Sequence, residues 1–181
     1  MRTEIDATDP DVPAVPASAT RPGTSTVERR ALLAGAGVLV LTGIHHVYGA
    51  ILYETPERYH AVFIAAAALF VMLAGRALVR RRNGSPADRI GRWTAWSVNA
   101  VVSVLLFGAV EGFYNHVVKV ALYFGGLSEA RMRVLFRSDL HEMPNDLIFE
   151  ATGVLQVVPA VLAGYYLVRA LRERRRGGRF A

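Results

Sequence analysis

Glu111-Gly-Phe-Tyr-Asn-His-Val-Val-Lys119 is a dense run of polar side chains inside a long hydrophobic segment. The apolar segment is long enough to span a membrane, and these polar residues would lie inside it: Glu111, Asn115, His116 and Lys119. Ionisable groups are costly in such a place and are kept mainly for function or for pairing with one another. The stretch therefore indicates a membrane protein with a polar site inside it.

The composition of the whole chain supports this interpretation. Of the 181 residues, 52% are hydrophobic, which is more than ordinary soluble domains contain. The formal net charge is +6, but the arginines cluster beside the ends of apolar segments, so the expected partner is the lipid bilayer and not nucleic acid. Other membrane subunits or a second copy of the chain stay open as partners. Cysteine is absent, so a metal would need histidine and oxygen ligands.

The apolar runs predict an all-α fold, with four transmembrane helices in an antiparallel bundle. The expected spans are about 31–53, 61–79, 93–124 and 147–168. They form a transmembrane domain over 28–172, between a disordered tail (1–27) and a basic tail (173–181). The third run would be roughly 48 Å long at 1.5 Å per residue, longer than the ~30 Å hydrocarbon core, so it must tilt or protrude.

Arginine clusters predict how these spans are oriented. They lie at 29–30, 80–92 and 169–179, and the positive-inside rule places all three in the cytoplasm. Both termini are then cytoplasmic, and the expected location is the plasma membrane. Arg29-Arg30 before an apolar run also fits a twin-arginine signal peptide, but apolar character resumes after His46 without a cleavage site, which favours an uncleaved helix.

The helical rise predicts the depth of the polar groups. His45 would lie about 21 Å above Ala31, and Glu111 about 22 Å above Trp96, so both would lie in the outer third of the hydrocarbon. His60 and His141 fall on the same side, so all five histidines gather there. Four antiparallel helices would bring these groups towards one outward-facing pocket.

Neutral imidazole and carboxylate groups match the ligands of Zn, non-haem Fe, Mn or Cu. The expected metal ligands are Glu111 and His116 first, then His46, His60 and Glu150. Asn115 and Lys119 are expected to support a bound cofactor by hydrogen bonding and by charge. His45 and His46 point about 100° apart, so only one is expected to face the bundle centre, with His46 slightly favoured.

Several functions remain open. The first hypothesis is a metal-binding pocket that supports redox or hydrolytic chemistry, with no substrate indicated and enzyme activity undecided. A b-type haem held between His46 and His116 is a second, less favoured because Glu111 and Lys119 make the surroundings polar. A third is a non-enzymatic subunit or assembly factor whose polar cluster only packs helices together. In that case Asp146 is a helix N-cap and Lys119 extends to the headgroups.

The segment Glu111-Gly-Phe-Tyr-Asn-His116 resembles the Glu-Gly-x-x-Asn/Asp-His element of an uncharacterised family of small bacterial integral membrane proteins. The resemblance covers part of one helix. That family usually has further histidines directly after the element, whereas Val117-Val118-Lys119 follows here. The resemblance implies a bacterial multi-pass membrane protein and carries over no activity.

Overall fold

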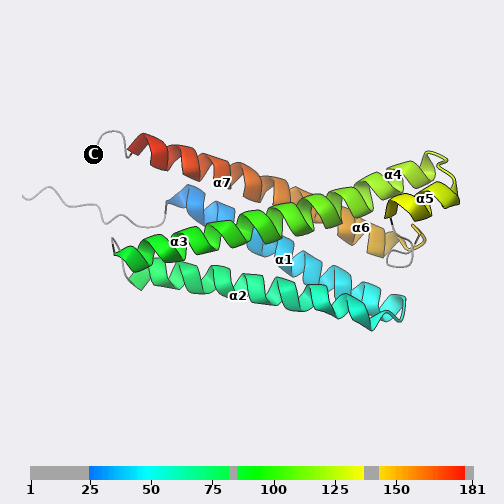
Figure 1. Cartoon of the computed structure of the whole chain (residues 1–181), viewed down its shortest axis with the longest axis horizontal. Helices are drawn as coiled ribbons and strands as arrows, with labels where there is room; N and C mark the ends of the chain where they lie inside the picture. The colour runs from blue at the N-terminus through cyan, green and yellow to red at the C-terminus, as the bar shows by residue number, and fades with distance from the viewer. Residues whose placement is uncertain (1–24, 82–84, 137–142, 178–181) are drawn as a thin grey trace, which may run out of the picture.

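The computed structural model describes residues 25–81, 85–136 and 143–177. Of these residues 90% are helical and none lies in a strand. Four long helical segments run antiparallel and pack side by side (Figure 1). The all-α bundle that the apolar runs predict is therefore confirmed.

The first two spans form a hairpin. α1 (Thr26–Leu52) begins at a capping box, in which the Ser25 hydroxyl accepts from Glu28 N and Glu28 Oε2 accepts from Ser25 N. The chain reverses where Glu54 takes a left-handed conformation (φ 53°), and η1 (Pro56–Arg58) leads into α2 (Tyr59–Arg81). The turn between them is short, so the two helices are held antiparallel.

The third span is one continuous helical segment made of three parts. They are α3 (Pro86–Val98), η2 (Asn99–Val118) and α4 (Lys119–Phe124), and the backbone of η2 is π-helical. Buried side chains recur every four or eight residues along this segment: Asn99, Ser103, Phe107, Asn115 and Lys119.

A short surface helix and a broken helix complete the chain. α4 ends at Gly125-Gly126, where Gly126 has a positive φ of 85°, and α5 (Glu129–Phe136) follows. The fourth span consists of α6 (Leu147–Leu155) and α7 (Val157–Gly177). Pro159 has no N–H to continue the ladder, which accounts for the break at Gln156. Gln156 is fully buried and accepts from the Thr42 hydroxyl at 2.6 Å.

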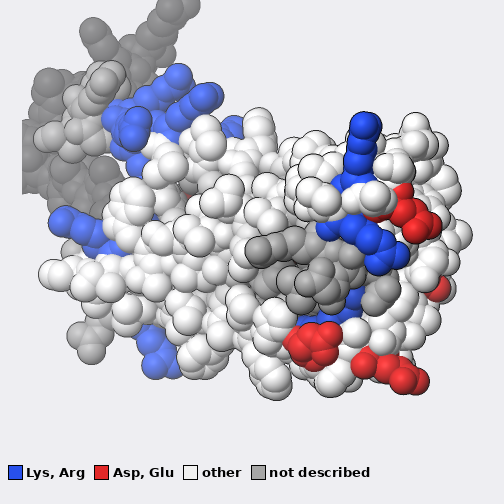
Figure 2. Space-filling view, turned by 45° about the vertical axis from the view of Figure 1, so that its right-hand side comes forward, with Lys and Arg blue, Asp and Glu red and all other residues white. Residues whose placement is uncertain are grey.

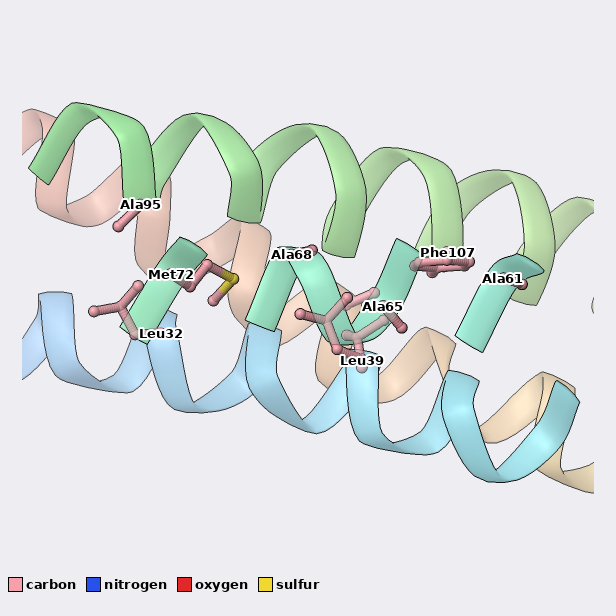
Figure 3. Close-up of a cluster of buried hydrophobic side chains, with 10 residues drawn as sticks. Leu32, Leu39, Ala61, Ala65, Ala68, Met72, Ala95 and Phe107 are labelled. Carbon is pink, nitrogen blue, oxygen red and sulfur yellow. The ribbon is translucent and has the colours of Figure 1, made fainter. Parts of the chain in front are cut away.

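Small side chains set the distance between helices. Gly75 and Gly91 bring α2 and α3 into backbone contact, because a Cβ on Gly75 would lie 2.5 Å from the Gly91 oxygen. The core between α1, α2 and the third span is built mainly from alanines with a few larger residues (Figure 3): Leu32, Leu39, Ala61, Ala65, Ala68, Met72, Ala95 and Phe107. This is the packing expected when helices associate within lipid.

Large apolar side chains point outward instead. Phe63 and Phe70 on α2 are 73% and 71% exposed. In Figure 2 the charged side chains lie towards the two ends, and most of the surface between them carries neither sign. Within the described residues, four helical segments are long and apolar enough to cross a membrane: Thr26–Leu52, Pro56–Arg81, Pro86–Phe124 and Leu147–Arg176. The chain is thus a multi-pass membrane protein.

The helices extend beyond the spans that the sequence predicts. α1 starts at Thr26, inside the expected tail 1–27, and α7 continues to Gly177, inside the expected tail 173–181. A buried ion cluster joins the start of α1, the start of α3 and the end of α7. Within it, Arg92 contacts Glu28 at 2.5 Å and Asp88 at 2.8 Å. Arg174 of α7 lies 3.4 Å from Glu28. The ends of the helices are thereby fixed to one another.

Candidate metal centre

Three imidazole nitrogens surround one carboxylate oxygen in the half of the bundle that holds the turn between α1 and α2. Glu111 Oε1 lies 3.5 Å from Nε2 of His116, which is on the same segment, η2. It also lies 3.8 Å from Nε2 of His45 and 3.6 Å from Nε2 of His46, both on α1. Ligand atoms of His45, Glu111 and His116 all lie within 4.8 Å of one another. This group could hold a metal ion.

The other nitrogen of two of these rings is occupied by α6. His116 Nδ1 lies 2.8 Å from Glu150 Oε2, a carboxylate that can only accept when it is ionised. His45 Nδ1 lies 3.0 Å from the Thr152 hydroxyl, which itself donates to backbone carbonyls of α6 at 2.9 Å. Both contacts favour a proton on Nδ1, so in the neutral rings the lone pair is on Nε2 and points at Glu111.

The spacing around Glu111 does not correspond to hydrogen bonding. N–H···O bonds are normally about 2.7–3.2 Å long, shorter than the three separations of 3.5, 3.6 and 3.8 Å. Two ligands bound 2.0–2.2 Å from a tetrahedral ion lie about 3.3–3.6 Å apart. Among the described residues, Nε2 of His45, His46 and His116 has no hydrogen-bond partner. The spacing is close to what a small cation at the centre would need.

Packing holds the ligand side chains in place. Phe149 stacks on the His45 ring at 4.2 Å, and Gly153 leaves room for His116, since a Cβ there would lie 2.3 Å from two of its ring atoms. Gly112 is close to Gly153 as well, and Gly108 lies against Ala160, so α6 and α7 both approach η2 closely here. His45 is 0% and His116 1% exposed. These two rings are thus enclosed by the bundle, whereas the Glu111 side chain is 14% exposed.

The remaining polar residues of the motif support this centre. Asn115 donates to the second oxygen of Glu111 at 2.8 Å. Lys119 lies 3.2 Å from Glu150 Oε1 and is only 2% exposed, so it is paired inside the bundle and does not extend to the headgroups. Asp146 caps α6 through a 2.7 Å bond from Phe149 N, which confirms the predicted N-cap.

The structure does not bring together every residue that the sequence proposed as a ligand. His60 is exposed at the start of α2, with its Nδ1 beside the Glu57 carbonyl, and His141 lies outside the described residues. Glu150 contacts the far nitrogen of His116 and does not face the central oxygen. Glu150 would therefore orient the His116 ring and would not bind the metal itself.

The prediction that only one of His45 and His46 faces the bundle centre is wrong. Both Nε2 atoms lie within 4 Å of Glu111 Oε1, and both side chains are buried. Side chains 100° apart can converge on a carboxylate that lies between them, and their rings meet edge to face at 5.1 Å. The sequence favours His46 over His45, and His45 is not among the expected ligands. The position of His45 next to His46 is the feature of the sequence that could have indicated its role.

No family model, curated protein or solved structure matches this chain. The function is therefore argued from the geometry of the site.

Proposed function

We propose that this protein binds a single transition-metal ion in the outer half of the membrane, with Glu111, His45 and His116 as ligands and His46 as a fourth donor. The convergence of three unpartnered Nε2 atoms on Glu111 Oε1 is the observation that carries the proposal. Without a cation, lone pairs would face a carboxylate inside a low-dielectric bundle, which is costly. A bound ion would turn the same arrangement into a favourable one.

The ligand types narrow the class of metal. Imidazole and carboxylate suit Zn, Fe, Mn or Cu. Any of these ions could polarise a substrate, and Fe, Mn or Cu, unlike Zn, could also carry an electron. A haem held between His46 and His116 would need a flat apolar slot between these two rings. The His45 ring lies 4.6 Å from the His116 ring and 5.1 Å from the His46 ring, so it packs against both proposed haem ligands. This packing favours a bare ion.

The first test is the metal content of the protein. After purification in mild detergent and reloading, we expect about one transition-metal ion per chain by elemental analysis. His116→Ala should lose most of this metal, because it removes a ligand and the imidazole that Glu150 contacts. His60→Ala is the matched control and should keep it, since His60 is exposed on α2. If the wild-type protein holds no stoichiometric metal, the metal-binding proposal is wrong and the histidines and Glu111 serve only to pack the helices together.

The second part of the proposal is orientation: a plasma-membrane protein with both ends in the cytoplasm and the metal centre towards the outside. It rests on the basic end of the bundle, where the last turns of α2 and α7 carry Arg80, Arg81 and Arg174–Arg176. The chain has no cysteine, so single cysteines can be labelled cleanly. An impermeant maleimide should label Ser128→Cys but not Ser85→Cys in intact cells. The reverse pattern would refute this orientation.

A further inference from the structure

A buried arginine lies beside Phe149, the ring that packs on the proposed centre. Arg58 ends η1 and is 8% exposed, with its stem beside Gly49 of α1. Its Nε donates to the Thr55 hydroxyl at 2.7 Å. Its guanidinium carbon lies 5.1 Å from the centre of the Phe149 ring, the ring that stacks on His45. Arg58 and the metal ligand His45 therefore contact the same aromatic side chain.

The described residues hold no carboxylate within ion-pair distance of Arg58. Its other contacts are the rings of Tyr53, at 5.3 Å, and Phe149. Cation–π contacts stabilise a guanidinium but do not neutralise its charge. Arginine keeps its proton in proteins, so this positive charge persists. The five N–H donors of the guanidinium are suited to a planar or tetrahedral anion.

Counting the charges shows when an anion would be needed. Among the residues that the structure describes, Glu111 and Glu150 balance Lys119 and Arg58, so their charges sum to zero when the histidines are neutral. A divalent ion would raise the total to +2. Asp146 accepts hydrogen bonds from the Tyr48 hydroxyl and from Phe149 N in the first turn of α6. If its charge is included, the total with a divalent ion is still +1. An uncompensated buried charge is costly, so metal loading creates a demand for a counter-anion.

We propose that the loaded centre binds a small soluble anion, such as a carboxylate, between the metal and the guanidinium of Arg58. This inference rests on the proposed metal site and adds the chemical class of its ligand. Arg58 would supply charge-assisted hydrogen bonds from the outer side, where η1 meets α6. Anion binding would then depend on the metal and on Arg58 together.

The test uses full-length protein loaded with Co²⁺ and titrated with azide, read from the visible absorption of the cobalt. We expect saturable azide binding by the loaded wild type and none by metal-free protein. Arg58→Lys keeps the charge and should bind within a few-fold. Arg58→Gln should bind about ten- to a hundredfold more weakly, since a hydrogen bond to a charged group is worth about 1.5–3 kcal/mol. If this variant does not fold, Arg58→Met keeps the apolar stem against both rings.

The outcomes separate the two proposals. This inference is overturned if the protein takes up cobalt but binds no azide. It is also overturned if wild type and Arg58→Gln bind azide with equal affinity. Either result leaves the metal site standing. A protein that takes up no metal overturns both. A phospholipid phosphate is the other anion available at this depth. If azide binds in non-ionic detergent but not in phosphatidylcholine nanodiscs, the headgroup occupies Arg58 and the soluble-anion inference fails.

Discussion

Replacing Glu111 with glutamine is expected to remove the metal from the protein while leaving the helices folded. Glutamine keeps the size of the side chain and can still accept from Asn115, but it has no negative charge to offset a cation. Changes in groups that only orient ligands already cost 10–100-fold in metal affinity. We therefore expect a loss of at least about a hundredfold for the central carboxylate, measured by competition with a chelator of known affinity.

The matched control is Glu57→Gln. Glu57 is an exposed carboxylate in η1 at the same end of the bundle, so this variant changes the net charge equally without touching the centre. It should bind metal as the wild type does. Retention of full metal affinity by Glu111→Gln would contradict the ligand assignment. A change in thermal stability alone would point to a structural role for the carboxylate within the bundle.

Gly153→Ala is expected to have the second largest effect, although it adds only one methyl group. The new Cβ would lie 2.3 Å from Cγ and Cδ2 of His116 and 2.5 Å from Nδ1, so the ring or α6 must move. Overpacking of this kind costs about 1–3 kcal/mol, partly offset by up to about 1 kcal/mol of better helix propensity. Movement of His116 also breaks its contact with Glu150. We expect a lower melting temperature and weaker metal binding together.

Gly43→Ala separates the clash from the change in helix propensity. Gly43 lies in α1, and a Cβ there meets no atom within 4 Å. The same substitution should leave metal binding unchanged and should not lower the melting temperature. Equal behaviour of the two variants would mean that α6 adjusts freely around the added methyl group, and the packing account of His116 would then be wrong.

Much of the architecture could be predicted from the sequence because it depends on local patterns. Apolar run lengths are enough to identify four membrane-spanning helices, and Gly125-Gly126 marks the end of the third. Asp146 is recognisable as an N-cap from its position before an apolar run. The polar run from Glu111 to Lys119 also indicates the depth of the site, since helical rise converts sequence separation into height.

What could not be predicted depends on which faces of different helices meet. Thr152 and Gly153 look like ordinary small residues of an apolar helix, and their roles appear only when α6 lies against His45 and His116. The π-helical backbone of η2 changes the rotation per residue, so an angular estimate based on 100° per residue does not hold there. Arg58 likewise reads as a turn residue until its burial beside Phe149 is seen.

The break at Gln156 divides the fourth span into two helices that are held at different places. α7 is held at its far end by the contact of Arg174 with Glu28. α6 carries Glu150, Thr152 and Gly153, which contact two of the imidazoles. A displacement of the histidines would therefore press first on α6, the helix on the side of the break that Arg174 does not hold.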